Sequence, residues 1–161
     1  MKNFLLIIFS IVLFTTCNAQ SIAKWKIGDL EKYMEKSNGP VIINFWATFC
    51  KPCIEEIPYF QQAIKEYEKQ GVKLLLVSLD LPDYYPGKIK KFADQQKYKA
   101  LIVWLDEYDA DYFCPKVDTA WSGAIPASLF VNNKTGYRKF FEEQIPKEVL
   151  RKEIDAMLTR E

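Results

Sequence analysis

The residues with the clearest chemical potential are two cysteines separated by two residues, in the segment Cys50-Lys51-Pro52-Cys53. An apolar run precedes them and an amphipathic pattern follows, so the pair lies where a strand ends and a helix begins. A helix N-terminus favours thiolate over thiol through its unpaired N–H groups and its dipole, and Lys51 adds a nearby cation. Pro52 is tolerated because first-turn N–H groups have no partner within the helix. We expect Cys50 to be exposed and to attack disulfides, and Cys53 to be more buried and to resolve the mixed disulfide.

Two other roles for such a cysteine pair compete with redox activity. A structural zinc site needs four ligands, but the chain has no histidine and, once Cys17 is used in export processing, only one cysteine beyond this pair, so we expect no metal. A purely structural disulfide is disfavoured because so small a loop stabilises little. The lack of histidine also excludes Ser-His-Asp and Cys-His nucleophiles and a CxxCH haem site. We therefore adopt the redox-active interpretation.

The composition is that of one ordinary globular domain. The chain has 161 residues, 49% of them hydrophobic, with 22 Lys plus Arg against 21 Asp plus Glu. The apolar content is too high for a disordered chain. The near-zero charge balance gives no reason to expect nucleic acid or an anionic membrane as a partner.

Residues 1–19 have the pattern of a secretory signal peptide, with a positive start and an apolar run of eleven residues that ends at Phe14. This run is about half the length of a membrane-spanning helix, which needs roughly 20 residues. Cleavage after Ala19 would release a chain that starts at Gln20. In the alternative, the residues before Cys17 form a loose lipobox, and Cys17 is lipidated and becomes the N-terminus. In both cases we expect a periplasmic or otherwise extracytoplasmic protein.

The hydrophobic pattern of residues 20–161 predicts a single domain in which strands and helices alternate. The expected elements are a helix at 28–37, a strand at 41–46, a helix at 51–70, a strand at 72–79, a helix at 87–97, a strand or extended segment at 101–105, a hairpin at 128–141 and a final helix from Pro146. The alternation implies parallel strands, and the hairpin adds an antiparallel edge. The prediction is an α/β fold with a mixed sheet flanked by helices.

A second candidate site feature is Pro126, which comes immediately before the first strand of the predicted hairpin. A trans proline would be an awkward lead-in to that strand. A cis Ile125–Pro126 bond would instead present the Ile125 backbone as an edge with which an extended substrate could pair.

The segment from Phe45 to Cys53, followed by Glu56 and Pro58, resembles the active-site segment of the thioredoxin superfamily, specifically its extracytoplasmic TlpA/ResA-like branch. Pro126 is similar in position to the cis-proline of that family. The resemblance extends over about residues 24–160. It implies a thioredoxin-like three-layer sandwich, thiol-disulfide exchange, no cofactor beyond the cysteine pair, and a signal peptide or lipid anchor.

The chain also departs from the family pattern. Asn44 stands where cytoplasmic thioredoxins carry a buried acid that assists proton transfer to the second cysteine. Asparagine cannot titrate, so that role falls to water, to Glu56 or to another acid such as Asp80. For Glu56 itself we expect a solvated carboxylate on the helix surface. Phe49 replaces a common tryptophan and keeps the apolar rim, and Trp46 is expected to pack in the core near the site.

Cys114 lies outside the family motif. Its ordinary interpretation is a buried, inert thiol. The alternative is a third redox thiol that forms a disulfide with a partner or with another copy of the chain.

The Lys-Pro pair between the cysteines is closer to reducing members of the superfamily than to strong oxidants, which often use a histidine to stabilise the thiolate. The leading hypothesis is a periplasmic reductase of disulfide-containing client proteins, with cytochrome c maturation as one setting, supplied by a membrane-bound electron donor. A disulfide oxidant and a non-catalytic client-binding module are the alternatives. A peroxide-directed enzyme is disfavoured because no arginine lies near the motif in sequence.

Overall fold

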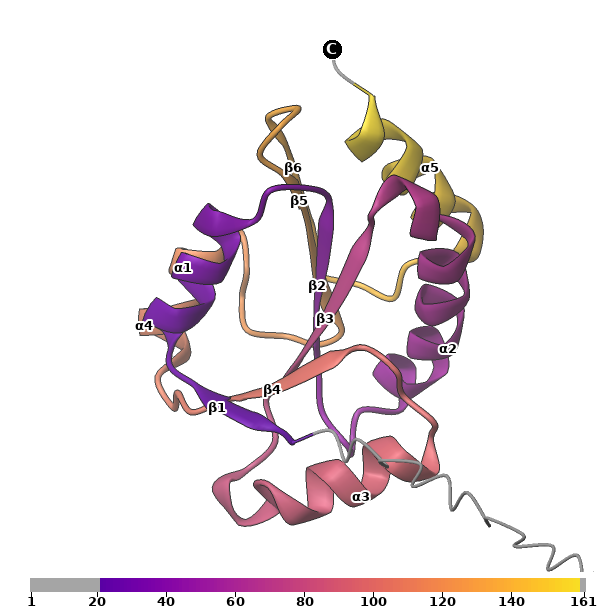
Figure 1. The fold of residues 1–161 in the computed structure, drawn as a ribbon. Coiled ribbons are helices and arrows are strands. Elements are labelled where there is room, and N and C mark those ends of the chain that lie inside the picture. Colours follow the sequence, from indigo (N-terminus) through magenta and orange to yellow (C-terminus); the bar gives the residue numbers. More distant parts are fainter. Residues whose placement is uncertain (1–20, 160–161) are drawn as a thin grey trace, which may run out of the picture.

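A central six-stranded sheet organises the computed structural model, which describes residues 21–159 (Figure 1). The strands are β1 (Ala23–Trp25), β2 (Val41–Trp46), β3 (Lys73–Ser78), β4 (Leu101–Leu105), β5 (Ala127–Asn132) and β6 (Tyr137–Phe141). Their order across the sheet is β1-β4-β3-β2-β5-β6. The first four in this order are mutually parallel, whereas β5 runs antiparallel to β2 and β6 antiparallel to β5. The predicted mixed sheet is confirmed.

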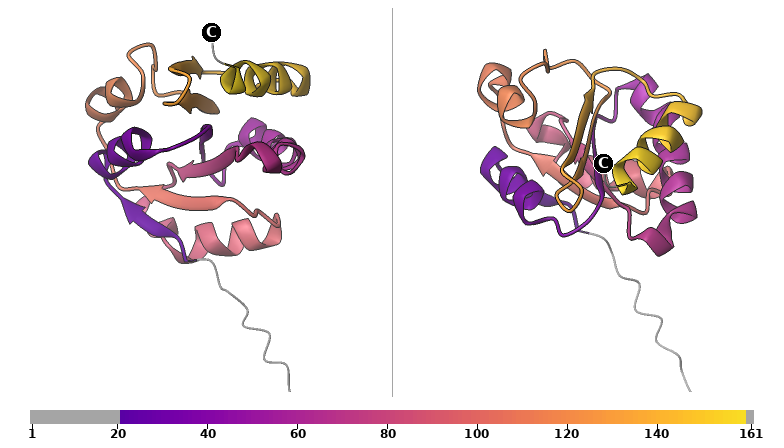
Figure 2. Two further views of the ribbon diagram at one scale, coloured as in Figure 1. Left: turned by 45° about the horizontal axis from the view of Figure 1, so that its top comes forward. Right: turned by 90° about the horizontal axis from the view of Figure 1, so that it is seen from above.

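Helices cover both faces of this sheet. They are α1 (Ile27–Lys36), α2 (Lys51–Glu66), α3 (Gly87–Gln95), α4 (Ala110–Val117) and α5 (Lys147–Leu158), with short 3-10 turns at η1 (Glu68–Gln70) and η2 (Pro82–Tyr84). Viewed from above, α1 and α4 lie on one side of the sheet, and α2 and α5 lie on the other (Figure 2). The three-layer α/β sandwich is therefore as expected.

The side chains of β2 show why the sheet has a core on each face. All six residues of this central strand are buried, as its apolar sequence predicts. Ile42 and Trp46 belong to the cluster that includes the inner faces of α2, α3 and α5. Ile43 and Phe45 belong to the second cluster, with α1 and α4. Because successive side chains of a strand point to opposite faces of the sheet, β2 packs against helices on both sides.

Two elements of the structure were not among the expected ones. The strand β1 has only three residues, which is too short to show a hydrophobic period. The helix α4 contains Pro115 and has an acidic residue in its first turn, so its sequence does not show a strong helical pattern. The helix predicted at 51–70 ends instead at Glu66, where η1 follows.

The predicted signal peptide at residues 1–19, including Cys17, lies outside the described residues. Between residues 21 and 159, no helix is both long enough and apolar enough to span a membrane.

Candidate active site

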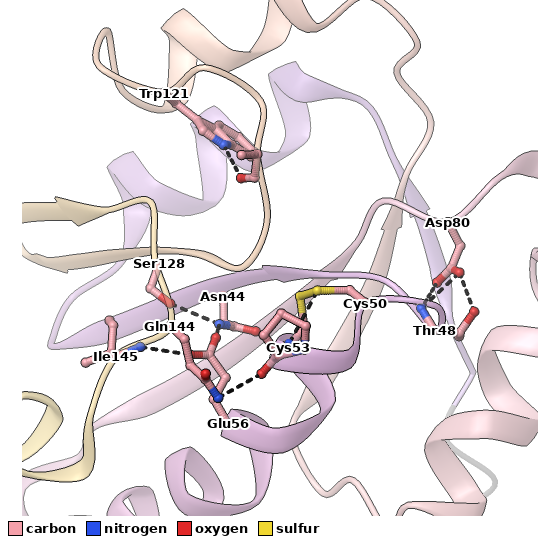
Figure 3. Close-up of a disulfide and its surroundings, with 12 residues drawn as sticks. Asn44, Thr48, Cys50, Cys53, Glu56, Asp80, Trp121, Ser128, Gln144 and Ile145 are labelled. Carbon is pink, nitrogen blue, oxygen red and sulfur yellow. Dashed lines mark hydrogen bonds between the residues drawn. A yellow bond between two sulfur atoms is a disulfide. The ribbon is translucent and has the colours of Figure 1, made fainter.

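The two cysteines of the CxxC segment form a disulfide at the start of α2 (Figure 3). Cys50 is the N-cap residue, and its Sγ accepts a hydrogen bond from the Cys53 backbone N–H at 3.3 Å. Pro52 lies in the first turn, where it removes no hydrogen bond of the helix. The sulfur of Cys50 is therefore placed where backbone N–H groups and the helix dipole favour negative charge on it.

The two cysteines differ less in exposure than we expected. Cys53 is fully buried, but Cys50 is also only 7% exposed, so the expectation of an exposed Cys50 is wrong. The reason is that Cys50 packs into the same apolar cluster as Trp46 and Ala47. Cys50 is nevertheless the more exposed of the two cysteines, which is the order that the assigned roles require.

The surroundings of Cys50 combine an apolar and a charged group at the surface. Phe49 is 65% exposed, which makes it an apolar contact immediately before the disulfide. The Lys51 side chain is 87% exposed and has Glu55 as a distant partner, at 3.8 Å. Trp46, as predicted, is fully buried in the core. Two exposed side chains, Phe49 and Lys51, thus flank Cys50 in the chain.

Glu56 does not lie on the solvated surface of α2, and that expectation is wrong. Its side chain is fully buried. The carboxylate accepts hydrogen bonds from Asn44 Nδ2 at 2.7 Å and from the Ile145 N–H at 3.1 Å. Burial raises the pKa of Glu56 to about 7, against the opposing effect of these two hydrogen bonds. Position 56 follows Cys53 by three residues, so both side chains lie on the inward face of the helix.

Asn44 links this acid to the neighbouring strand. Its Nδ2 also donates to Ser128 Oγ at 2.9 Å, so one amide bridges α2 and β5 to one side of the disulfide (Figure 3). Asn44, which cannot titrate, therefore holds a titratable acid, Glu56.

The Ile125–Pro126 peptide bond is cis, as predicted. Pro126 is buried and precedes β5, in which Ala127 pairs with Phe45 of β2. This register places Pro126 beside the carboxyl end of β2, from which the chain continues to the disulfide. The cysteine pair and the cis-proline are thus brought together by the pairing of β2 with β5.

Comparison with known proteins identifies a family for this chain. Residues 15–135 match the model of the AhpC/TSA family. The chain belongs to the AhpC/TSA family. Over 118 residues it is 29% identical to the thiol-disulfide oxidoreductase ResA of Geobacillus thermodenitrificans, a match that covers 73% of this chain and 62% of that protein. The chain thus spans less than two thirds of the curated relative.

Solved structures also resemble this AhpC/TSA chain in fold. A thiol:disulfide interchange protein of the thioredoxin family from Chlorobium tepidum has a TM-score of 0.62 at 17% identity, covering 79% of this chain and 85% of its own. A thioredoxin-related protein from Neisseria meningitidis has a TM-score of 0.59 at 24% identity, covering 76% and 84% of the two chains. The fold is thioredoxin-like.

Asp80, the other acid considered for proton transfer, is engaged elsewhere in this family member. It is buried, and its carboxylate accepts hydrogen bonds from the N–H and hydroxyl of Thr48 and from the Ser78 hydroxyl. Figure 3 shows it on the opposite side of Cys50 from Glu56. Asp80 thus shapes the loop between β2 and α2.

Cys114 is buried in α4, as the ordinary interpretation of this thiol predicts. Burial raises its pKa to about 11, and the nearby acids Glu142 and Asp111 act in the same direction. Its Sγ lies under the loop that leads to the cis-proline, 3.8 Å from where a Cβ on Gly123 would be. Among residues 21–159, no cluster of three or more Cys, Asp or Glu side chains is arranged to hold a metal ion.

Proposed function

We propose that this protein is an extracytoplasmic thiol-disulfide oxidoreductase that reduces disulfides in client proteins. The observation that carries the proposal is the Cys50–Cys53 disulfide at a helix N-terminus, with a buried acid of pKa about 7 on the same helix face. The name of the Geobacillus relative, a thiol-disulfide oxidoreductase, supports the reaction class.

The reaction consists of two exchanges that transfer two electrons to the client. The Cys50 thiolate attacks one sulfur of the client disulfide, and the other client sulfur leaves as a thiolate. The Cys53 thiolate then attacks Cys50 Sγ in this mixed disulfide. The second client sulfur leaves, and the protein is left with the disulfide seen in the structure.

Glu56 is the proposed acceptor for the Cys53 proton. Cys53 must lose this proton before it can attack, and it is fully buried away from bulk water. Glu56 lies one turn further along the same face of α2, and a carboxyl group with a pKa of about 7 is matched to proton transfer near neutral pH. Lys51 and Pro52 shape the turn between the sulfurs.

Client binding is assigned to the surface around the disulfide. The Ile125 backbone, next to the buried Pro126, offers hydrogen-bonding groups to an extended client, and the exposed Phe49 offers apolar contact. Trp46 supports this surface from the core.

Reducing activity outside the cytoplasm needs a source of electrons, which we assign to a membrane-bound donor. The export follows from the signal-peptide pattern of residues 1–19. Cytochrome c maturation is one setting in which such a reductase would act. Cell fractionation of the wild type and of Cys17→Ser separates the two export routes, since only a lipid anchor through Cys17 is lost in the variant.

Insulin reduction by dithiothreitol tests the activity. The wild type should accelerate it, and Cys50→Ser should abolish the acceleration, whereas equal rates would identify a non-catalytic binding module. Cys53→Ala should accumulate mixed disulfides on Cys50 in the native envelope and so identify the clients. A reduction potential near that of strong periplasmic oxidants, about −120 mV, would reverse the proposed direction.

A further inference from the structure

The loop that connects β6 to α5 contacts three separate parts of the candidate active site. We call residues 142–146 the connector. Its members bond to the loop that precedes the cis-proline, to the turn between the two cysteines and to the buried acid of α2. In sequence, α2, which contains both Pro52 and Glu56, is far from the connector and from the loop before the cis-proline.

The first of these contacts fixes the loop before the cis-proline. Glu142 Oε1 accepts hydrogen bonds from the backbone N–H groups of Ser122 at 3.0 Å and Ala124 at 2.9 Å, and also from the Ser122 hydroxyl. The indole N–H of the buried Trp121 donates to the carbonyl of Ala124 at 2.9 Å. Both backbone groups of Ala124 are therefore held, one residue before Ile125.

Strand pairing explains why Glu142 reaches this loop. Phe141, the last residue of β6, pairs with Ser128 of β5, and Glu142 follows directly. On the other side of β5, Ala127 pairs with Phe45 of β2. The sheet register therefore places the Glu142 carboxylate at the same end of the sheet as the disulfide.

The rest of the connector bonds to α2. Gln144 Nε2 donates to the carbonyl of Pro52 at 3.3 Å, and the Ile145 N–H donates to Glu56 Oε2 at 3.1 Å. Tyr59, also on α2, donates from its hydroxyl to the carbonyl of the fully buried Ile145 at 2.6 Å. These three hydrogen bonds hold the connector against α2. They therefore also fix the backbone from which the Glu142 side chain extends.

We propose that Glu142 is a positioning residue for client binding. Its carboxylate holds the backbone from Ser122 to Ala124 in the shape in which Ile125 can pair with an extended client. This inference rests on the proposed function, because it concerns the surface that such a client would use. Glu142 acts through Ser122 and Ala124 and does not touch the sulfurs.

The contacts predict which kinetic constant depends on Glu142. A loop that is fixed before binding has less conformational entropy to lose when the client binds. Without the carboxylate, the backbone N–H groups of Ser122 and Ala124 lose their charged acceptor and bond to water instead. The loop is then less ordered before binding, and part of the binding free energy is used to order it. The KM for a peptide client should rise, whereas the chemistry of Cys50 with a small reagent should not change.

The test compares Glu142→Ala, Glu142→Gln and the control Glu143→Ala. Glu143 is an exposed neighbour with no hydrogen bond or ion pair to residues 21–159. Each protein is assayed for reduction of a peptide with one disulfide and, in its reduced form, for alkylation of Cys50 by iodoacetamide. For Glu142→Ala we expect the peptide KM to rise about tenfold, with kcat and alkylation rate within about twofold of wild type.

The other variants sharpen this expectation. Glu142→Gln should show a smaller rise in KM, because it keeps one acceptor oxygen without the charge. Glu143→Ala should behave like the wild type. An unchanged KM in a folded Glu142→Ala would overturn the inference, and so would an equal loss in the peptide and iodoacetamide reactions, which indicates general damage.

Failure of the proposed function is distinguishable from failure of this inference. If the wild type reduces neither the peptide nor a small disulfide, the proposed function is wrong. Affinity of the oxidised variants for the same peptide then tests the positioning role directly: weaker binding by Glu142→Ala supports it, and equal binding overturns it.

Discussion

At the scale of single residues, Glu56 provides a group that titrates near neutral pH in a chain without histidine. Its pKa is raised because the carboxyl group is fully buried on the inward face of α2. Two hydrogen bonds, from Asn44 and Ile145, keep the ionised form accessible. The acid therefore changes its charge in the pH range in which the cysteine pair is expected to work.

The second exchange step should depend on this charge. As pH rises through 7, Glu56 ionises and becomes able to accept the Cys53 proton, so the rate of client release from Cys50 should rise and then level off. In Glu56→Gln this inflection should disappear, and the rate should fall about 100-fold. The rate is measured as single-turnover release of a peptide from a preformed mixed disulfide with Cys50. An unaltered pH profile in the variant would contradict the role of Glu56.

Glu56 should also affect stability in the oxidised protein. Its folded-state pKa, about 7, lies above its ordinary value of 4.5, so its contribution is fully present below pH 4.5 and is lost as pH rises to 7. The shift corresponds to about 3 kcal/mol. Denaturant unfolding at pH 5 and pH 8 should show a larger loss of free energy of unfolding in the wild type than in Glu56→Gln. Equal losses would contradict the burial of this carboxyl group.

At the scale of elements, the strength of the hydrophobic period decided what could be predicted from the sequence. The strand β2 is an unbroken apolar run, and α2 and α5 have one-sided stripes, so all three were predictable. In β1 only three residues pair with β4, and a pattern that short carries no period. The expectation for Glu56 is wrong because a glutamate ordinarily lies at the surface, whereas residues 53, 56, 57 and 60 form one buried stripe of the helix.

The loop between β2 and α2 should depend on Asp80. This buried carboxylate accepts from Thr48 and Ser78, so Asp80→Ala leaves the half-buried Thr48 donors and the buried Ser78 hydroxyl without this acceptor and should lower the free energy of unfolding by about 3 kcal/mol. The exposed Asp83 in η2 is the matched control. Asp83→Ala should change the free energy of unfolding by less than about 0.5 kcal/mol. Denaturant titration measures both. Similar small changes in the two variants would show that Asp80 does not hold the loop.

At the scale of the whole molecule, the sheet separates two apolar clusters. Neighbouring residues of β2 contribute to different clusters, because successive side chains of a strand point to opposite faces. Each cluster is shared with a different set of helices. The domain is thus stabilised by two cores on opposite faces of the sheet, and Ile125 before β5 packs against both.

The separation predicts additive effects of core substitutions. Ile42 and Ile43 are both fully buried, one in each cluster. Ile42→Val and Ile43→Val should each lower the free energy of unfolding by about 1 kcal/mol. The double variant should lose the sum to within about 0.5 kcal/mol, because the two side chains point to opposite faces of the sheet and belong to different clusters. A larger interaction energy in this double-mutant cycle would show that the two cores are coupled.

The edges of the sheet bear on how the molecule avoids aggregation. The outer strands are β1, which has three residues, and β6, which carries Arg138 and Lys139 next to each other. Short and cationic edge strands discourage pairing with foreign chains. The sheet therefore discourages unwanted pairing at its two margins, whereas the proposed client would pair with the backbone before Pro126, at the start of the interior strand β5.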